Sequence, residues 1–126
     1  LNRSYKKKDR NIDVSISADE IQLEIERAVP FAMILNELLV NSYSHAFKGL
    51  KSGTIFIEIR KEDRRIVLRI RDNGIGLPSN FQIVKQDTLG MKLIQTLAKQ
   101  LKGEFRIEHQ EKTAFTLEMP VMTSAA

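Results

Sequence analysis

The chain has 126 residues, a formal net charge of +4 and no cysteine. This length fits one domain. A hydrophobic fraction of 42% and a charged fraction of 29% are ordinary for a globular protein. The absence of cysteine excludes disulfides and thiolate metal sites, and two histidines, His45 and His109, are too few for a histidine-rich metal site. No apolar run reaches the roughly 20 residues of a membrane span and the start lacks a signal-peptide pattern. We therefore expect a cytoplasmic domain that makes no membrane contact itself.

The first eleven residues are predicted to form a basic, solvated arm. Its positive side chains are Arg3, Lys6, Lys7, Lys8 and Arg10. No pattern of a nucleic-acid-binding module accompanies them, so we expect no nucleic-acid partner. Because the chain begins with Leu1 rather than Met, we expect it to be a piece of a longer protein, which is itself soluble or membrane-attached.

The next elements follow from hydrophobic periodicity. Alternation of apolar residues predicts a strand over residues 11–17, whereas residues 18–26 fit either a strand or a helix. Apolar residues at three- and four-residue spacing then predict a helix from about Ala28 to about Phe47, with Pro30 tolerated in its first turn.

The second half of the chain reads as two hairpins around a helix. Residues 53–61 and 64–71 alternate and predict an antiparallel hairpin, and residues 77–88 form a loop long enough to suggest a function. A helix over 89–101 is predicted to stop at Gly103, before a last hairpin of residues 104–110 and 113–120.

Together these elements predict an α/β fold, a two-layer sandwich with helices on one face of a mixed, largely antiparallel sheet of five strands. The domain is expected to span residues 12–120, with a tail at 121–126.

The first helix carries a stripe of polar side chains in "NELLVNSYSHAF". Glu37, Asn41 and His45 are four residues apart and therefore share one helix face. A carboxylate and an amide oxygen are suited to Mg²⁺ with phosphate. The alternative is a polar helix edge near the surface.

A second feature is "RDNGIGLP", at the end of a predicted strand. Asp72, which we expect at the surface, offers a carboxylate to an exocyclic amino group, and Gly74 and Gly76 let the backbone approach a flat ring. The alternative is a simple turn, which explains the second glycine less well than the first.

The third feature is "DTLGMKLI", which places Gly90 at the start of the second helix. A helix N-terminus presents free N–H groups to an anion such as a phosphate. An ordinary helix entry is the alternative.

The order of these three features resembles the nucleotide-binding domain shared by histidine kinases, anti-sigma-factor serine kinases, gyrase, Hsp90 and the MutL proteins. The resemblance covers roughly Ile12 to Pro120. Within that group, "ILNELLVNSYSHAFKG" and "TLGMKLIQTLAKQLKGEF" are most similar to the catalytic domain of sensor histidine kinases with a short ATP lid.

The resemblance implies binding of ATP and Mg²⁺ and roles for individual residues. Asn41 would coordinate Mg²⁺, Glu37 would act beside it as the catalytic residue, and Asp72 would bind the adenine amino group. The full set of implied cofactor-binding residues is Asn41, His45, Lys48, Asp72, Gly74, Gly76, Leu77, Thr88, Leu89, Gly90 and Met91.

The chain departs from the family pattern at two positions. Ser44 stands where many relatives have a lysine or an arginine. The cation that faces the phosphates would therefore come from Lys48, Lys85 or Lys92. Thr88 stands where other histidine kinases have a glycine, which predicts a weaker grip on phosphate.

The resemblance also implies partners. These are a dimerisation domain of the same parent protein, which bears the phosphoacceptor histidine, and a response regulator. Because no such acceptor helix precedes Ile12, we expect the chain to bind ATP without completing autophosphorylation alone. Two alternatives stay open, an anti-sigma-factor serine kinase and a degenerate nucleotide-binding or scaffold module.

Overall fold

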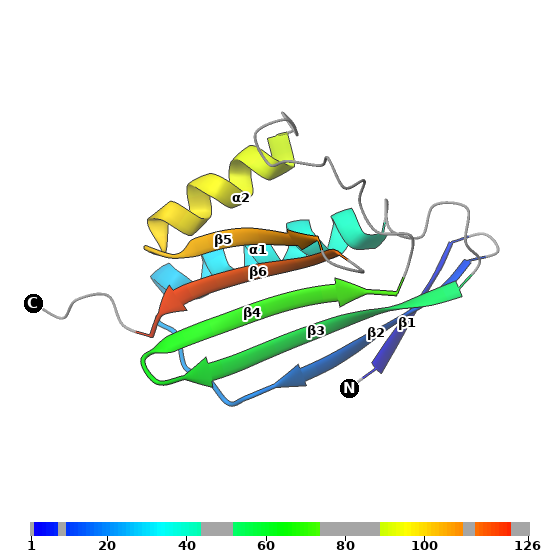
Figure 1. The fold of residues 1–126 in the computed structure, drawn as a ribbon, viewed down its shortest axis with the longest axis horizontal. Helices are drawn as coiled ribbons and strands as arrows, with labels where there is room; N and C mark the ends of the chain where they lie inside the picture. The colour runs from blue at the N-terminus through cyan, green and yellow to red at the C-terminus, as the bar shows by residue number, and fades with distance from the viewer. Residues whose placement is uncertain (1, 8–9, 44–51, 74–88, 110–112, 122–126) are drawn as a thin grey trace, which may run out of the picture.

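The computed structural model describes residues 2–7, 10–43, 52–73, 89–109 and 113–121. In chain order the elements are β1 (Asn2–Lys7), β2 (Arg10–Ala18), α1 (Ile25–Asn41), β3 (Ser52–Glu62), β4 (Arg65–Asp72), α2 (Leu89–Gln100), β5 (Glu104–His109) and β6 (Thr113–Pro120). They form one sheet of order β1-β2-β3-β4-β6-β5, on one face of which both helices lie (Figure 1). Among the six strands of the described ranges, β2 and β3 pair in parallel and the other neighbouring strands pair antiparallel. The predicted two-layer sandwich is confirmed.

The structure adds a strand that the sequence did not predict. β1 pairs antiparallel with β2, in the register that joins Tyr5 to Ile12, and makes the sheet six-stranded. The basic arm was expected to be solvated because its many charged residues leave no alternation of apolar and polar residues that would predict a strand. An edge strand tolerates such a composition, since only one of its sides needs a backbone partner.

The predicted helix boundaries shift at the start of α1. This helix begins at Ile25, three residues before the predicted start, and residues 19–24 are an irregular connection. The predicted extension to Phe47 falls on residues 44–47, which lie outside the described ranges. Neither helix of the described chain is long and apolar enough to cross a membrane.

The core lies between the helices and the sheet. Alternate residues of β4 point inward, so Ile66, Leu68 and Ile70 are almost fully buried. They meet the buried face of α1, which includes Ile34 and Leu38. The other apolar residues of this core are Ile12, Val14, Phe31, Ile55, Ile57, Met91, Ile94, Leu97, Ala98, Leu101, Phe115, Leu117 and Met119.

The opposite face of the sheet is charged and ion-paired. Arg69 lies 3.2 Å from Glu108, and Arg106 lies 2.9 Å from Glu118. The hydrogen bond from Arg106 lowers the pKa of the Glu118 carboxyl below its ordinary value. This composition is typical of an antiparallel sheet with one wet face.

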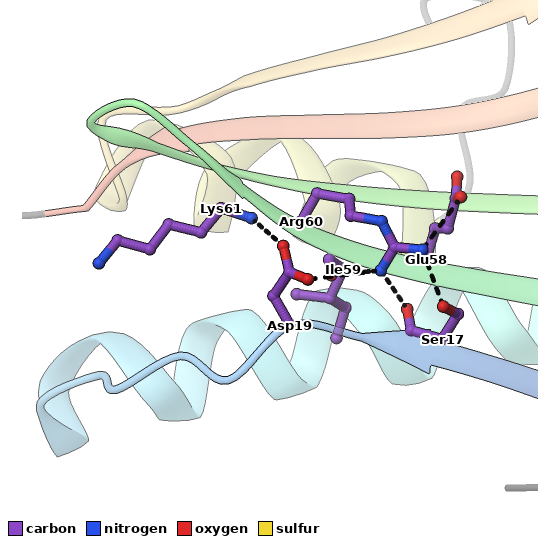
Figure 2. A network of polar contacts seen from close by, with 6 residues as sticks. All are labelled: Ser17, Asp19, Glu58, Ile59, Arg60 and Lys61. Carbon is purple, nitrogen blue, oxygen red and sulfur yellow. Dashed lines mark hydrogen bonds and ion pairs between the residues drawn. The ribbon is translucent and has the colours of Figure 1, made fainter.

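A polar network fixes the point where the chain leaves β2 (Figure 2). The Arg60 guanidinium donates to the carbonyl and hydroxyl oxygens of Ser17, at 3.1 and 2.7 Å. Asp19 accepts from the Lys61 backbone N–H at 2.9 Å and donates its own N–H to the Ile59 carbonyl at 2.8 Å. These bonds hold the end of β2 and the start of the segment that leads to α1 against the last residues of β3.

A buried arginine holds the other end of the same region. Arg27, in the first turn of α1, is 8% exposed and donates to the backbone carbonyls of Pro120 and Val121. Within the described residues its Nε atom has no partner. Arg27 therefore fastens the start of α1 to the end of β6.

Candidate functional site

The described candidate residues gather at one end of the sandwich. Glu37 and Asn41 lie in the last two turns of α1, Asp72 is the last residue of β4, and Gly90 is the second residue of α2. The C-terminal ends of α1 and β4 and the start of α2 all lie toward the same end of the sheet (Figure 1). Residues far apart in sequence thus lie toward the same end of the sheet.

A direct contact joins the first and third sequence features. A Cβ atom built on Gly90 would lie 2.8 Å from Oε2 of Glu37. Glu37 is half-buried, and its carboxylate covers the backbone at the start of α2. The glycine is therefore needed for close approach, and the φ angle of Gly90 is not left-handed.

Asp72 is buried, contrary to the expectation of a surface position. It is 4% exposed because it continues the inward phase of Ile66, Leu68 and Ile70. Its carboxylate therefore belongs to the layer between the sheet and the helices. A buried carboxylate is retained only where hydrogen-bond donors satisfy it.

Asn73, the residue after Asp72, closes the end of β4 through hydrogen bonds to Thr54. The Thr54 backbone N–H donates to the Asn73 side-chain oxygen at 2.8 Å, and the Asn73 N–H donates to the Thr54 carbonyl at 3.2 Å. This reciprocal pair fixes where the chain leaves β4. Sequence reasoning missed Asn73, although its place in D-N-G was a signal for it.

Ser42 is a further residue that the sequence left unassigned. It directly follows Asn41, is 2% exposed, and its hydroxyl has no hydrogen-bond partner among the described residues. An unsatisfied buried hydroxyl costs about 1–3 kcal/mol, so it marks a place where a ligand or water would be stabilised. Its position in the apolar phase of the helix was the only sequence signal.

The first residues of α2 differ in their exposure. Leu89 is 84% exposed, whereas the Met91 side chain is 4% exposed and belongs to the core. A ligand would therefore meet Met91 through its backbone. The other predicted residues, His45, Lys48, Gly74, Gly76, Leu77 and Thr88, lie outside the described residues, as does Lys85.

The donor set suits a metal ion only if a ligand supplies further oxygens. Glu37 and Asn41 offer hard oxygen atoms, which Mg²⁺ prefers. In the part of the chain that the structure describes, no three His, Cys, Asp or Glu side chains form a metal cluster.

Comparisons with known proteins agree with this arrangement. Residues 26–123 match the family described as histidine kinase-, DNA gyrase B-, and HSP90-like ATPase. The sensor histidine kinase PdtaS of Mycobacterium tuberculosis is 31% identical over 117 residues, covering 90% of this chain. The chain spans 23% of that relative's length.

Solved structures share the fold at lower identity. The histidine kinase domain of a blue-light-activated kinase from Erythrobacter litoralis superposes with a TM-score of 0.80 at 22% identity, covering 87% of this chain and 52% of that one. The catalytic domain of the histidine kinase ThkA gives a TM-score of 0.66 at 17% identity, with 86% and 79% covered. The chain belongs to the histidine kinase-, DNA gyrase B- and HSP90-like ATPase family, and its fold is that of the ATP-binding catalytic domain of sensor histidine kinases.

Proposed function

We propose that this chain binds ATP with Mg²⁺ and donates the γ-phosphoryl group to a histidine on a separate dimerisation domain of the same parent protein. The observation that carries the proposal is the contact of the Glu37 carboxylate with the backbone at Gly90, at the end of the sandwich where Asp72 is buried. Membership of this ATPase family supports the binding of a nucleotide, and the position of these residues supports binding at this end of the sandwich.

Each described residue has a role that its position supports. The inward carboxylate of Asp72 accepts a hydrogen bond from the adenine amino group, which a buried acid does strongly. Asn41 offers its amide oxygen to Mg²⁺, and Glu37 orients the reacting group beside the start of α2. Mg²⁺ with the phosphates would neutralise the charge that develops during transfer.

The acceptor is proposed to lie outside this chain. Phosphoryl transfer depends mainly on positioning and charge stabilisation, so a nucleotide-binding domain can act on an acceptor presented by another domain. The relative PdtaS is named a sensor histidine kinase and is about four times as long as the matched region. A response regulator is the proposed final receiver of the phosphoryl group.

One experiment separates this function from the serine-kinase alternative. The chain is incubated with radiolabelled ATP and Mg²⁺, alone and with the dimerisation domain from its parent gene. We expect no labelling of the chain alone, and acid-labile, base-stable label on the added domain, as a phosphohistidine requires. A label that is stable to acid would contradict the proposal and favour a serine kinase of the anti-sigma-factor type. The anti-sigma F factor of Bacillus licheniformis is 26% identical to this chain over 68 residues.

The metal role of Asn41 has its own test. ATP affinity is compared with Mg²⁺ and with a chelator, in the parent chain and in Asn41→Ala. We expect the variant to lose the magnesium-dependent gain in affinity and to keep much of the binding that remains in the chelator. An unchanged gain in the variant would remove Asn41 from the metal shell.

A further inference from the structure

Helix α1 is apolar on two opposite faces. One face is buried in the core. On the other face, Ile25, Val29, Met33 and Val40 are 73%, 51%, 41% and 49% exposed. We call these four residues the α1 stripe. Their spacing of four, four and seven residues keeps them in one row along the helix. An exposed row of apolar side chains on a protein surface often marks an interaction site.

A groove runs between this stripe and α2. It has a volume of about 380 Å³ and is lined by Val29, Ala32, Met33, Asn36, Glu37 and Leu93. The walls of this groove are formed by the neighbouring helices α1 and α2. Such a groove can accept the side chains of a third helix. Apolar anchors at helical spacing that enter such a trough are a common mode of peptide recognition.

The exposed charges of α1 beside the stripe are all acidic, whereas the basic Lys92 of α2 is next to Leu93 on the other side of the groove. Glu24 and Glu26 flank Ile25 and are exposed, and Glu37 lies at the groove. The one basic residue of α1, Arg27, is buried and donates hydrogen bonds to backbone carbonyls at the end of β6. This is an acidic rim on a chain whose net charge is +4. Two copies of the stripe would bring their carboxylates together, so the charge argues against self-association.

We propose that the α1 stripe and its groove dock an amphipathic helix of a protein partner, one whose apolar row is flanked by lysine or arginine. The apolar row would cover the stripe, and its basic flanks would face Glu26 and Glu37. This surface is separate from the buried Asp72, yet it shares Glu37 with the candidate site.

Sharing Glu37 has a consequence that rests on the proposed function. The same carboxylate lines the groove and touches the backbone at Gly90. If the site binds nucleotide, the docked helix and the nucleotide change each other's affinity by the same factor. Docking itself is expected with or without nucleotide.

The test uses a synthetic peptide of about 18 residues, the length of one long helix such as α1. Its leucines are spaced for one helical face and are flanked by lysines, and a twin peptide carries glutamates in place of the lysines. Binding is followed by ¹H–¹⁵N chemical shifts of the nucleotide-free chain. We expect shifts centred on Val29, Met33 and Leu93, and roughly tenfold weaker binding of the acidic twin.

Two variants with the same charge change control the mapping. Met33→Lys should weaken binding of the basic peptide at least about tenfold, because it removes an apolar anchor and adds a like charge. Ser52→Lys, exposed on β3 and out of phase with the buried Ile55 and Ile57, lies on the sheet face away from the helices and should leave binding unchanged. Both positions are exposed, so circular dichroism should report an intact fold in each.

Several results would overturn the proposal. These are shifts centred elsewhere, equal binding of the two peptides, equal binding by Met33→Lys, or Overhauser contacts that join the Met33 methyl group to another part of this chain or to a second copy. Failure of the proposed function would look different. The peptide would still map to the α1 stripe while ATP produced no shifts.

Discussion

Gly90 and Gly103 lie at opposite ends of α2, and each is a glycine because another group comes close. At Gly90 the neighbour is the mobile end of the Glu37 side chain, whereas at Gly103 it is the backbone carbonyl of Glu118. A side chain can move aside and a strand backbone cannot. The same substitution is therefore expected to affect function at one end of the helix and stability at the other.

Gly90→Ala should change activity without loss of stability. The added Cβ would displace the Glu37 carboxylate, and alanine suits a helix better than glycine by up to about 1 kcal/mol. We expect a melting temperature equal to or above that of the parent. Phosphoryl transfer to the dimerisation domain should fall roughly a hundredfold, because small misplacements of a reacting group are costly. Full activity combined with a lower melting temperature would contradict the role given to this contact.

Ser42→Ala should stabilise the nucleotide-free chain. Removing a buried hydroxyl that has no partner within the described structure should raise the free energy of unfolding by about 1 kcal/mol. If the hydroxyl meets nucleotide or a bound water, ATP affinity should fall about fivefold, the equivalent of one hydrogen bond.

Ser17→Ala provides the matched control for Ser42→Ala. The Ser17 hydroxyl accepts from Arg60 at an exposed position on β2, so this change should cost a little stability and leave ATP affinity unchanged. Denaturant unfolding and ATP titration measure both quantities. A destabilised Ser42→Ala chain would mean that the hydroxyl is satisfied in solution.

At the scale of elements, sequence periodicity located most of the structure. The alternation in β3, β4, β5 and β6 and the spacing in α2 were sufficient, because each has one wet face and one buried face. The periodicity misplaced the start of α1. Residues such as Ile25 and Val29 are apolar but exposed, so they obscure the boundary between the core face and the outer face.

Long-range contacts could not be predicted from the sequence. Arg27 reads as an ordinary surface charge, and only the fold brings the carbonyls of Pro120 and Val121 to it. The three sequence features of the site were predicted because each has its own local pattern. The burial of Asp72 and the contact of Glu37 with Gly90 depend on how α1, α2 and the sheet pack together.

The end of α2 is another place where a contact between distant segments could not be predicted from the sequence. Gly103 was predicted to end the helix, yet the left-handed residue is Lys102, with φ 56°. The Lys102 N–H bonds to the Lys99 carbonyl and the Gly103 N–H to the Ala98 carbonyl, at 3.0 and 2.8 Å, which is a Schellman motif. The glycine is required one residue later, by the packing of this turn on β6.

Gly103→Ala should therefore destabilise the domain. A Cβ would lie 2.6 Å from the Glu118 carbonyl oxygen and 3.2 Å from the Met119 Cβ, so α2 would have to shift away from β6. We expect a loss of about 1–3 kcal/mol in the free energy of unfolding, the usual cost of overpacking. Denaturant unfolding measures it beside Gly90→Ala. Equal stability of the two variants would contradict the assignment of different neighbours.

At the scale of the whole molecule, one helix connects three regions. The start of α1 is fastened to β6 by Arg27, its outer face bears the α1 stripe along the length of the helix, and its last two turns carry Glu37 and Asn41. The end of β4, whose last residue is Asp72, lies toward the same end of the sheet (Figure 1). A helix docked on the stripe and a ligand at the site would therefore contact the same helix, α1.

The central claim is that the end of the sandwich around Asp72 binds adenine nucleotide. Isothermal titration of ATP with Mg²⁺ into the parent chain, Asp72→Asn and the neighbouring control Arg71→Lys tests it most directly. We predict one-to-one binding by the parent and the control. Asp72→Asn should bind roughly ten- to hundredfold more weakly, the worth of one charge-assisted hydrogen bond, while it melts near the parent temperature without ligand. Absence of binding by the parent chain, or equal affinity of Asp72→Asn, would contradict the account.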